Sequence, residues 1–170
     1  MEIFIAIRTF FEAGGNVLYL IAAATFFMWA LIFERVWFIR TEHKEDVREA
    51  VIYWQKRGET TSWNAQMMRE RIISEVSLRL TQNMSFIKTL ISLLPLLGLL
   101  GTVTGMVQVF EAMTYSGGNA RSMAAGVSAA TIPTMSGMVA TLSGVLANTF
   151  LSSKVAKEES LMEDSLSMEH

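Results

Sequence analysis

The chain alternates between long uncharged stretches and shorter polar ones. Two uncharged stretches, residues 92–110 and 123–151, follow each other closely, and between residues 88 and 154 only Glu111 and Arg121 carry a charge. A helix of about 20 apolar residues crosses the hydrocarbon core of a bilayer. The pattern therefore predicts a transmembrane hairpin.

A third apolar stretch, residues 16–39, is also long enough to cross a membrane. Trp37 lies near its end, and Glu34, Arg35 and Arg40 close it. Aromatic rings and long basic side chains settle at the depth of the lipid headgroups, so this end marks an interface. Glu34 is expected to pair with Arg35 or Arg40 there rather than to take part in ion passage.

Residues 1–14 carry large apolar side chains at helical spacing, with charged residues such as Arg8 and Glu12 elsewhere on the helical wheel. This pattern is typical of an amphipathic helix that lies in the membrane interface. It lacks the basic leader and the small-residue cleavage site of a signal peptide. Gly14 and Gly15 are expected to break the helix before the first span.

Residues 41–85 form the one sizeable polar segment and hold most of the basic side chains. Basic residues are retained on the cytoplasmic side of membrane proteins, so we expect this segment to be cytoplasmic. Acidic residues are interspersed among the basic ones, which makes a nucleic-acid surface a poor interpretation. The resulting domain organisation is an interfacial helix at 1–14 and a loop at 115–122 on the outer side, spans at 15–40, 86–114 and 123–152, and cytoplasmic segments at 41–85 and 153–170.

The polar segment also contains the pattern of a helix. Four apolar side chains recur in it at four-residue steps: Met68, Ile72, Val76 and Leu80. Glu75 and Arg79 are spaced to pair along the same helix, and residues 58–62 are typical of a turn before it. No helix-breaking residue lies between Asn64 and Pro95, so this helix is expected to run without interruption into the second span.

Small and polar side chains occupy one half of the second span. On a helical wheel they are Gly98, Gly101, Thr104, Gly105 and Gln108, and larger apolar residues occupy the other half. Gly101 and Gly105 form a GxxxG pattern, which is typical of helices that approach each other closely, with or without a role beyond packing. We expect this half to face another helix or a cavity.

The third span carries a polar line. Three polar side chains recur along it at seven-residue steps: Thr134, Thr141 and Asn148. They would form a nearly straight line about 21 Å long, flanked by Gly137. Such a line indicates either hydrogen bonds between helices or a wetted path, and the pattern alone favours packing. Pro133 removes the amide that would bond the carbonyl of Ala129, so a bend or a polar neighbour is expected there.

The amino-acid composition indicates the class of protein and excludes several kinds of functional site. Hydrophobic residues make up 51% of the 170 residues and mean hydropathy is +0.35, above the roughly 45–50% of soluble domains, which predicts an all-α integral membrane protein. Cysteine is absent and histidine occurs only at His43 and His170, so disulfides, thiol chemistry and a cysteine–histidine zinc site are excluded. The sequence contains no pattern typical of an active site, so no enzyme, metal or cofactor is predicted.

Two motifs resemble a known family. LGLLGTVTGM at residues 97–106 and AAGVSAATIPTMSGMVATLSG at residues 124–144 look like the membrane hairpin of the ExbB, TolQ and MotA proton-channel family. The short chain with three spans is most similar to the compact ExbB proteins of TonB energising systems. The resemblance implies a protein of the bacterial inner membrane, surrounded by lipid, with a periplasmic N-terminus and a cytoplasmic C-terminus.

The resemblance also implies partners. An ExbB protein forms a homo-oligomer, a pentamer, whose second and third spans line a pore around single-span helices of an ExbD-like protein with a proton-binding aspartate. The pore threonines of the family correspond to Thr102 and Thr134, and Ala129 stands where longer ExbB proteins carry a glutamate. A TonB-like protein would transmit the mechanical work to outer-membrane receptors.

The chemistry of the residues agrees that another chain must supply the acid. Threonine hydroxyls donate, accept and orient water, but they do not titrate in the working range of a proton relay. We expect Thr102 and Thr134 to bond the carboxylate of the partner or its water, and Thr141 and Asn148 to continue a wetted path toward the cytoplasm. A non-conducting membrane scaffold and a TolQ-like or MotA-like stator are the alternatives. They differ in whether the threonines face an axial cavity or a dry helix interface.

Overall fold

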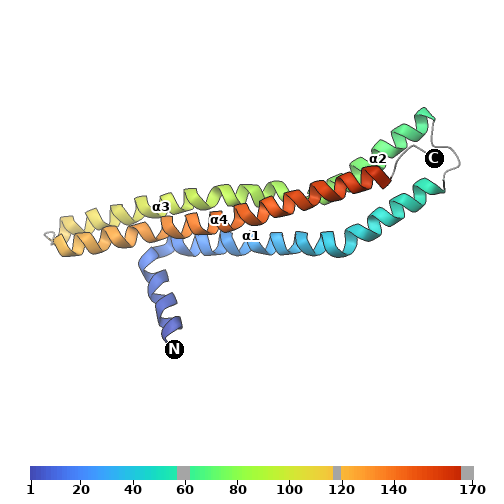
Figure 1. Ribbon diagram of the computed structural model, residues 1–170. Coiled ribbons are helices and arrows are strands. Elements are labelled where there is room, and N and C mark those ends of the chain that lie inside the picture. Colours follow the sequence, from blue (N-terminus) through green and yellow to red (C-terminus); the bar gives the residue numbers. More distant parts are fainter. Residues whose placement is uncertain (57–61, 117–119, 166–170) are drawn as a thin grey trace. The chain divides into compact units, whose positions relative to one another are not determined.

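The computed structural model describes residues 1–56, 62–116 and 120–165, and these residues form helices and no strand (Figure 1). The helices are α1 (Glu2–Gln55), α2 (Trp63–Thr81), α3 (Met84–Ser116) and α4 (Ala120–Ser165). Within these described ranges, three segments are long and apolar enough to cross a membrane: Gly14–Thr41, Trp63–Tyr115 and Met123–Ser165. The prediction of an all-α membrane protein with three spans is confirmed.

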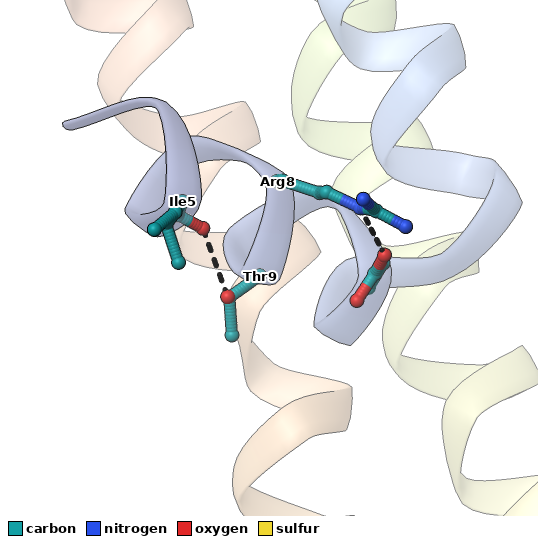
Figure 2. A network of polar contacts seen from close by, with 4 residues as sticks. Ile5, Arg8 and Thr9 are labelled. Carbon is teal, nitrogen blue, oxygen red and sulfur yellow. Dashed lines mark hydrogen bonds and ion pairs between the residues drawn. The ribbon is translucent and has the colours of Figure 1, made fainter. Parts of the chain in front are cut away.

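The predicted break before the first span lies at Gly15. Its backbone has φ 65° and ψ −165°, a combination that residues with a side chain rarely adopt. The preceding helical turns point away from the span that follows (Figure 1). Figure 2 shows the polar side of this segment, where Arg8 Nε lies 2.8 Å from Glu12 Oε1 and the Thr9 hydroxyl donates to the carbonyl of Ile5.

Residue contacts divide the chain into two units. The first unit contains Met1–Trp29 and Lys88–Leu146, and the second contains Ala30–Ile87 and Ala147–His170. In the first unit, α3 and α4 run side by side, and the part of α1 that follows Gly15 lies against them (Figure 1). The buried hydrophobic side chains of the first unit are Leu18, Ile21, Met28, Ile91, Leu94 and Ala130.

Glycines allow the backbones of α3 and α4 to approach closely. A Cβ atom added at Gly137 would lie 2.6 Å from the carbonyl oxygen of Leu94, and one added at Gly105 would lie 2.7 Å from Cβ of Ala130. At Gly98 the added atom would lie 3.0 Å from Cα of Thr134. Small residues thus bring the two helices together, as is common for helix pairs in membranes.

In the second unit, Arg35 of α1 is almost fully buried, with a relative exposure of 3%. Its Nη1 atom donates to the carbonyl of Arg79 at 3.0 Å, and its guanidinium lies 5.2 Å from the centre of the Phe38 ring. Glu34 Oε2 lies 3.4 Å from Arg35 Nε, so the predicted pairing of Glu34 with an arginine is confirmed.

The prediction of one uninterrupted helix from the polar segment into the second span was wrong. Helix α2 ends at Thr81, and α3 begins at Met84 after Asn83, which has a φ of 63°. Asparagine adopts this left-handed conformation more readily than most residues, because its short side chain can bond the backbone locally. The buried guanidinium of Arg35 also favours the end of α2, where the helix dipole is negative.

The second unit also joins α2 to the end of α4. The Ser77 hydroxyl donates to the carboxylate of Glu159, and Arg69 Nη2 donates to the carbonyl of Glu163 at 3.1 Å. Of the predicted apolar stripe of α2, Val76 and Leu80 are buried, and Met68 and Ile72 are half-buried. Glu75 and Arg79 pair at 3.6 Å, as their spacing predicted.

The ends of the helices bear on two other predicted segments. Helices α3 and α4 extend to Ser116 and from Ala120, so they occupy much of the loop predicted at 115–122. Helix α4 continues to Ser165 and so extends well into the segment predicted at 153–170. The predicted turn at 58–62 lies outside the described residues except at Ser62, and residues 117–119 and 166–170 also lie outside them.

Candidate functional site

Thr102 of α3 and Thr134 of α4 lie face to face in the first unit. Their hydroxyl oxygens are within hydrogen-bond distance of each other, and both side chains are half-buried. The oxygen of Thr134 lies 2.9 Å from the carbonyl oxygen of Gly98, and that of Thr102 lies 3.3 Å from the same oxygen. Two hydroxyls and one carbonyl thus meet where the helices are in close contact.

The local sequence explains why the hydroxyls can meet. Gly98 has no side chain, and a Cβ atom there would lie 3.1 Å from the carbonyl oxygen of Pro133. Pro133 is fully buried, and its ring packs against Gly101. A larger residue at either glycine would push α4 away from α3 and separate the two hydroxyls.

The hydrogen bonds of this hydroxyl pair can be counted. Each hydroxyl has one proton to donate and two lone pairs to accept with. In every arrangement that uses both contacts, one hydroxyl donates to the Gly98 carbonyl and the other donates to its neighbouring hydroxyl. Both hydroxyl protons are therefore already used, one on the Gly98 carbonyl and one between the two hydroxyls, and most of the lone pairs of the two hydroxyl oxygens remain available. The pair is an acceptor for a proton-donating group.

The other two residues of the predicted polar line do not join this pair. The Thr141 hydroxyl donates to the carbonyl of Gly137 in its own helix at 2.7 Å. Asn148 belongs to the second unit, and its Oδ1 atom is buried without a hydrogen-bond partner among the described residues. The continuous path along Thr134, Thr141 and Asn148 stays a prediction.

The chemistry available at the hydroxyl pair is limited. Glu111 and Arg121, the charged residues of the hairpin, are both exposed, and the described residues contain no cluster of three or more potential metal ligands. Thr102 and Thr134 can orient water or accept a hydrogen bond, but they cannot carry a proton through a titration cycle. The arrangement therefore fits a proton-handling site only if a titratable group is supplied from elsewhere.

A cavity of about 580 Å³ lies beside the hydroxyl pair, between α1, α3 and α4 of the first unit. Its polar lining residues are Glu12 and Asn16 of α1 and Thr104 and Gln108 of α3. From the sequence, Glu12 was expected only on the polar side of an interfacial helix. The glycines at 14 and 15 predicted a break there, but the direction of the preceding helix, which depends on the backbone conformation of Gly15, has no sequence signal.

Comparison with known proteins agrees with the motifs. The sequence profile of the MotA/TolQ/ExbB proton channel family matches residues 38–164, which contain Thr102 and Thr134. A segment of 72 residues is 38% identical to a protein from Synechocystis that is described as an ExbB-like biopolymer transport protein. That match covers 40% of this chain and 28% of the relative, so the chain spans well under half of the relative's length.

Proposed function

The chain belongs to the MotA/TolQ/ExbB proton channel family, and we propose that it is the channel subunit of a TonB energising complex in the bacterial inner membrane. In this complex the flow of protons across the membrane is converted into mechanical work for transport through the outer membrane. The observation that carries the proposal is the hydroxyl pair of Thr102 and Thr134, which presents free lone pairs from the contact between α3 and α4.

The partner supplies the group that titrates. An ExbD-like protein with a single span would place its aspartate beside the hydroxyl pair inside a homo-oligomer, a pentamer as in ExbB. The hydroxyl pair accepts hydrogen bonds, so it stabilises the protonated aspartic acid, which has a proton to donate. When the aspartate loses that proton, one hydroxyl must turn to donate to it and give up its bond either to the Gly98 carbonyl or to the other hydroxyl. Protonation of the partner is thereby coupled to the contact between α3 and α4.

The proposed orientation follows the distribution of basic residues. Segments 41–85 and 153–170 lie in the cytoplasm, and segments 1–14 and 115–122 lie in the periplasm, with spans at 15–40, 86–114 and 123–152. Thr141 and Asn148 lie on the cytoplasmic side of the hydroxyl pair along α4, so they extend the proton path in that direction. A TonB-like protein receives the work on the periplasmic side.

The experiment replaces Thr134 by valine, which keeps the shape of the side chain and removes its hydroxyl. Energised uptake by a TonB-dependent receptor is measured in cells that carry the variant together with its ExbD-like partner. We expect uptake to fall at least 100-fold, with unchanged amounts of assembled complex. Thr25→Val is the matched control, because the Thr25 hydroxyl bonds only the carbonyl of Ile21 in its own helix, at 2.7 Å.

The same experiment separates the alternatives. Full uptake in Thr134→Val would refute the proposed role and favour a non-conducting scaffold, in which the hydroxyls only hold helices together. Loss of envelope integrity or of motility, with normal receptor-dependent uptake, would instead indicate a TolQ-like or MotA-like stator. The glycine contacts of α3 and α4 are compatible with all of these functions, so they do not discriminate between them.

A further inference from the structure

We propose that the cavity between α1, α3 and α4 is a water-filled entry chamber in which Glu12 receives protons from the outer side and passes them toward Thr102 and Thr134. This inference rests on the proposed function, because it assigns an entry route to the same proton pathway. We call the cavity the entry chamber. It contains about 580 Å³, room for on the order of ten to twenty waters at roughly 30 Å³ each.

The polar lining of the entry chamber favours water, and its two amide side chains, Asn16 and Gln108, are exposed. Asn16 and Gln108 make no side-chain hydrogen bond within residues 1–56, 62–116 and 120–165, yet both line the chamber. An amide left without a partner in hydrocarbon costs several kcal/mol, so lipid chains are poor occupants of this space. Thr104 uses its proton within α3, on the carbonyls of Leu100 or Gly101, and keeps its lone pairs for water.

The backbone of α4 adds a further acceptor. Pro133 has no amide proton, so the carbonyl of Ala129 lacks its usual partner within the helix. Ala129 and Pro133 both line the entry chamber. Water in the chamber can donate to this carbonyl, which explains how a proline is accommodated at this depth without a bonding side chain.

The entry chamber ends next to the hydroxyl pair. Gly101 and Pro133 both line it and contact each other, and the residues that follow them are Thr102 and Thr134. The chamber therefore reaches the residue before each threonine in the sequence, and neither threonine itself lines it.

Among the described residues that line the entry chamber, Glu12 is the only one with a charged side chain. It is exposed, so it can exchange protons with the outer solution, and Arg8 of the same helix segment pairs with it at 2.8 Å. Helices α3 and α4 contribute no titratable side chain to the lining. In each cycle the carboxylate takes one proton from outer water and releases it to chamber water, and so returns to its starting state.

The first experiment tests for water in the chamber. The chain has no cysteine, so a single introduced thiol reports on its own surroundings. Gln108→Cys is compared with Val107→Cys, an exposed neighbour on α3 that does not line the chamber. The assembled complex in membranes is treated from the outside with the charged reagent methanethiosulfonate ethyltrimethylammonium. This reagent reacts with thiolate, which forms only in water.

We expect Gln108→Cys to react at least ten-fold faster than Val107→Cys. Asn16→Cys should behave like Gln108→Cys, because Asn16 reaches the same chamber from α1. Equal rates for Gln108→Cys and Val107→Cys, or no reaction at either chamber position, would overturn the proposal.

The second experiment tests the carboxylate. Glu12→Gln keeps the size of the side chain and removes its titratable group, and Glu2→Gln on the same helix segment is the control, because Glu2 does not line the chamber. Proton flux through the complex is measured against outer pH. Glu12→Gln should lower the flux at least five-fold at alkaline outer pH, where protons are scarce, and Glu12→Asp should restore it. A flux profile identical to that of the unmodified chain would overturn the role of Glu12.

The two experiments fail in distinguishable ways. Thiol labelling does not require proton flux. A water-filled chamber in a complex that conducts no protons would therefore refute the proposed function but still support the presence of water in the cavity. A dry chamber in a complex that conducts protons would refute the proposed entry route without contradicting the proposed function.

Discussion

Gly137→Ala should separate α3 from α4, and its effect can be worked out from the structure. The new methyl carbon would lie 2.6 Å from the carbonyl oxygen of Leu94, whereas an ordinary contact between these atom types is roughly 3.3 Å. The obstacle is backbone, which cannot rotate away as a side chain can. The helices must therefore move apart by about 0.7 Å at this point.

The movement has two costs. Overpacking of this kind destabilises a protein by about 1–3 kcal/mol. The same shift would lengthen the 2.9 Å contact between Thr134 Oγ1 and the Gly98 carbonyl to about 3.6 Å, beyond hydrogen-bond range, at a cost of about 1 kcal/mol. Alanine regains up to about 1 kcal/mol because it favours the helix more than glycine does. The net loss in the free energy of unfolding is then about 1–3 kcal/mol.

Gly144→Ala is the matched control in the same helix. Its methyl carbon would lie 2.5 Å from Sδ of Met28 and 2.9 Å from Cγ1 of Ile91, and both atoms belong to side chains that can rotate. Gly144→Ala should change the free energy of unfolding by no more than about 1 kcal/mol, because the helix preference of alanine offsets the cost of repacking these side chains. The assay is reversible unfolding of the chain in mixed detergent micelles, followed by circular dichroism. Equal losses in the two variants would refute the argument that backbone contact at Gly137 sets the helix separation.

Three predictions concern the second unit. Arg35→Met removes the donor to the Arg79 carbonyl and should destabilise the end of α2 by about 1–2 kcal/mol, seen as faster amide hydrogen exchange around residues 79–84; unchanged exchange would contradict this. Asn83→Ala should cost about 1 kcal/mol in unfolding free energy because of the positive φ, whereas Asn83→Gly should be neutral; an equal cost for both would show that the φ is not the cause. Ser77→Ala and Glu159→Ala should show a coupling of about 1 kcal/mol in a double-mutant cycle of unfolding, and strictly additive effects would contradict their hydrogen bond.

The long elements could be predicted from sequence because their signals are strong. Three apolar stretches predicted helices of membrane length, and the adjacent glycines at 14 and 15 predicted the break before the first span. The break at Asn83 was missed because asparagine is not a strong helix breaker. The buried Arg35 that favours this break comes from a helix far away in the sequence, and contacts of that kind leave no local pattern.

The candidate site also contains features that the sequence predicted and features that it could not predict. A helical wheel placed Gly98 and Gly101 on the contact face of α3, and both are buried. That Thr102 meets Thr134 depends on the register of α3 against α4, which the sequence suggested only through the family resemblance. Glu12 and its cavity could not be derived, because they depend on the direction in which the chain leaves Gly15.

The most direct test of the account is proton flux through the purified complex, assembled with the ExbD-like partner that we propose, in liposomes that carry a pH gradient. Thr134→Ser keeps the hydroxyl and should conduct within about three-fold of the unmodified chain, because its oxygen can still bond the Gly98 carbonyl. Thr134→Val should conduct at background level. Flux through Thr134→Val equal to that of the unmodified chain would contradict the claim that the hydroxyl pair handles the proton.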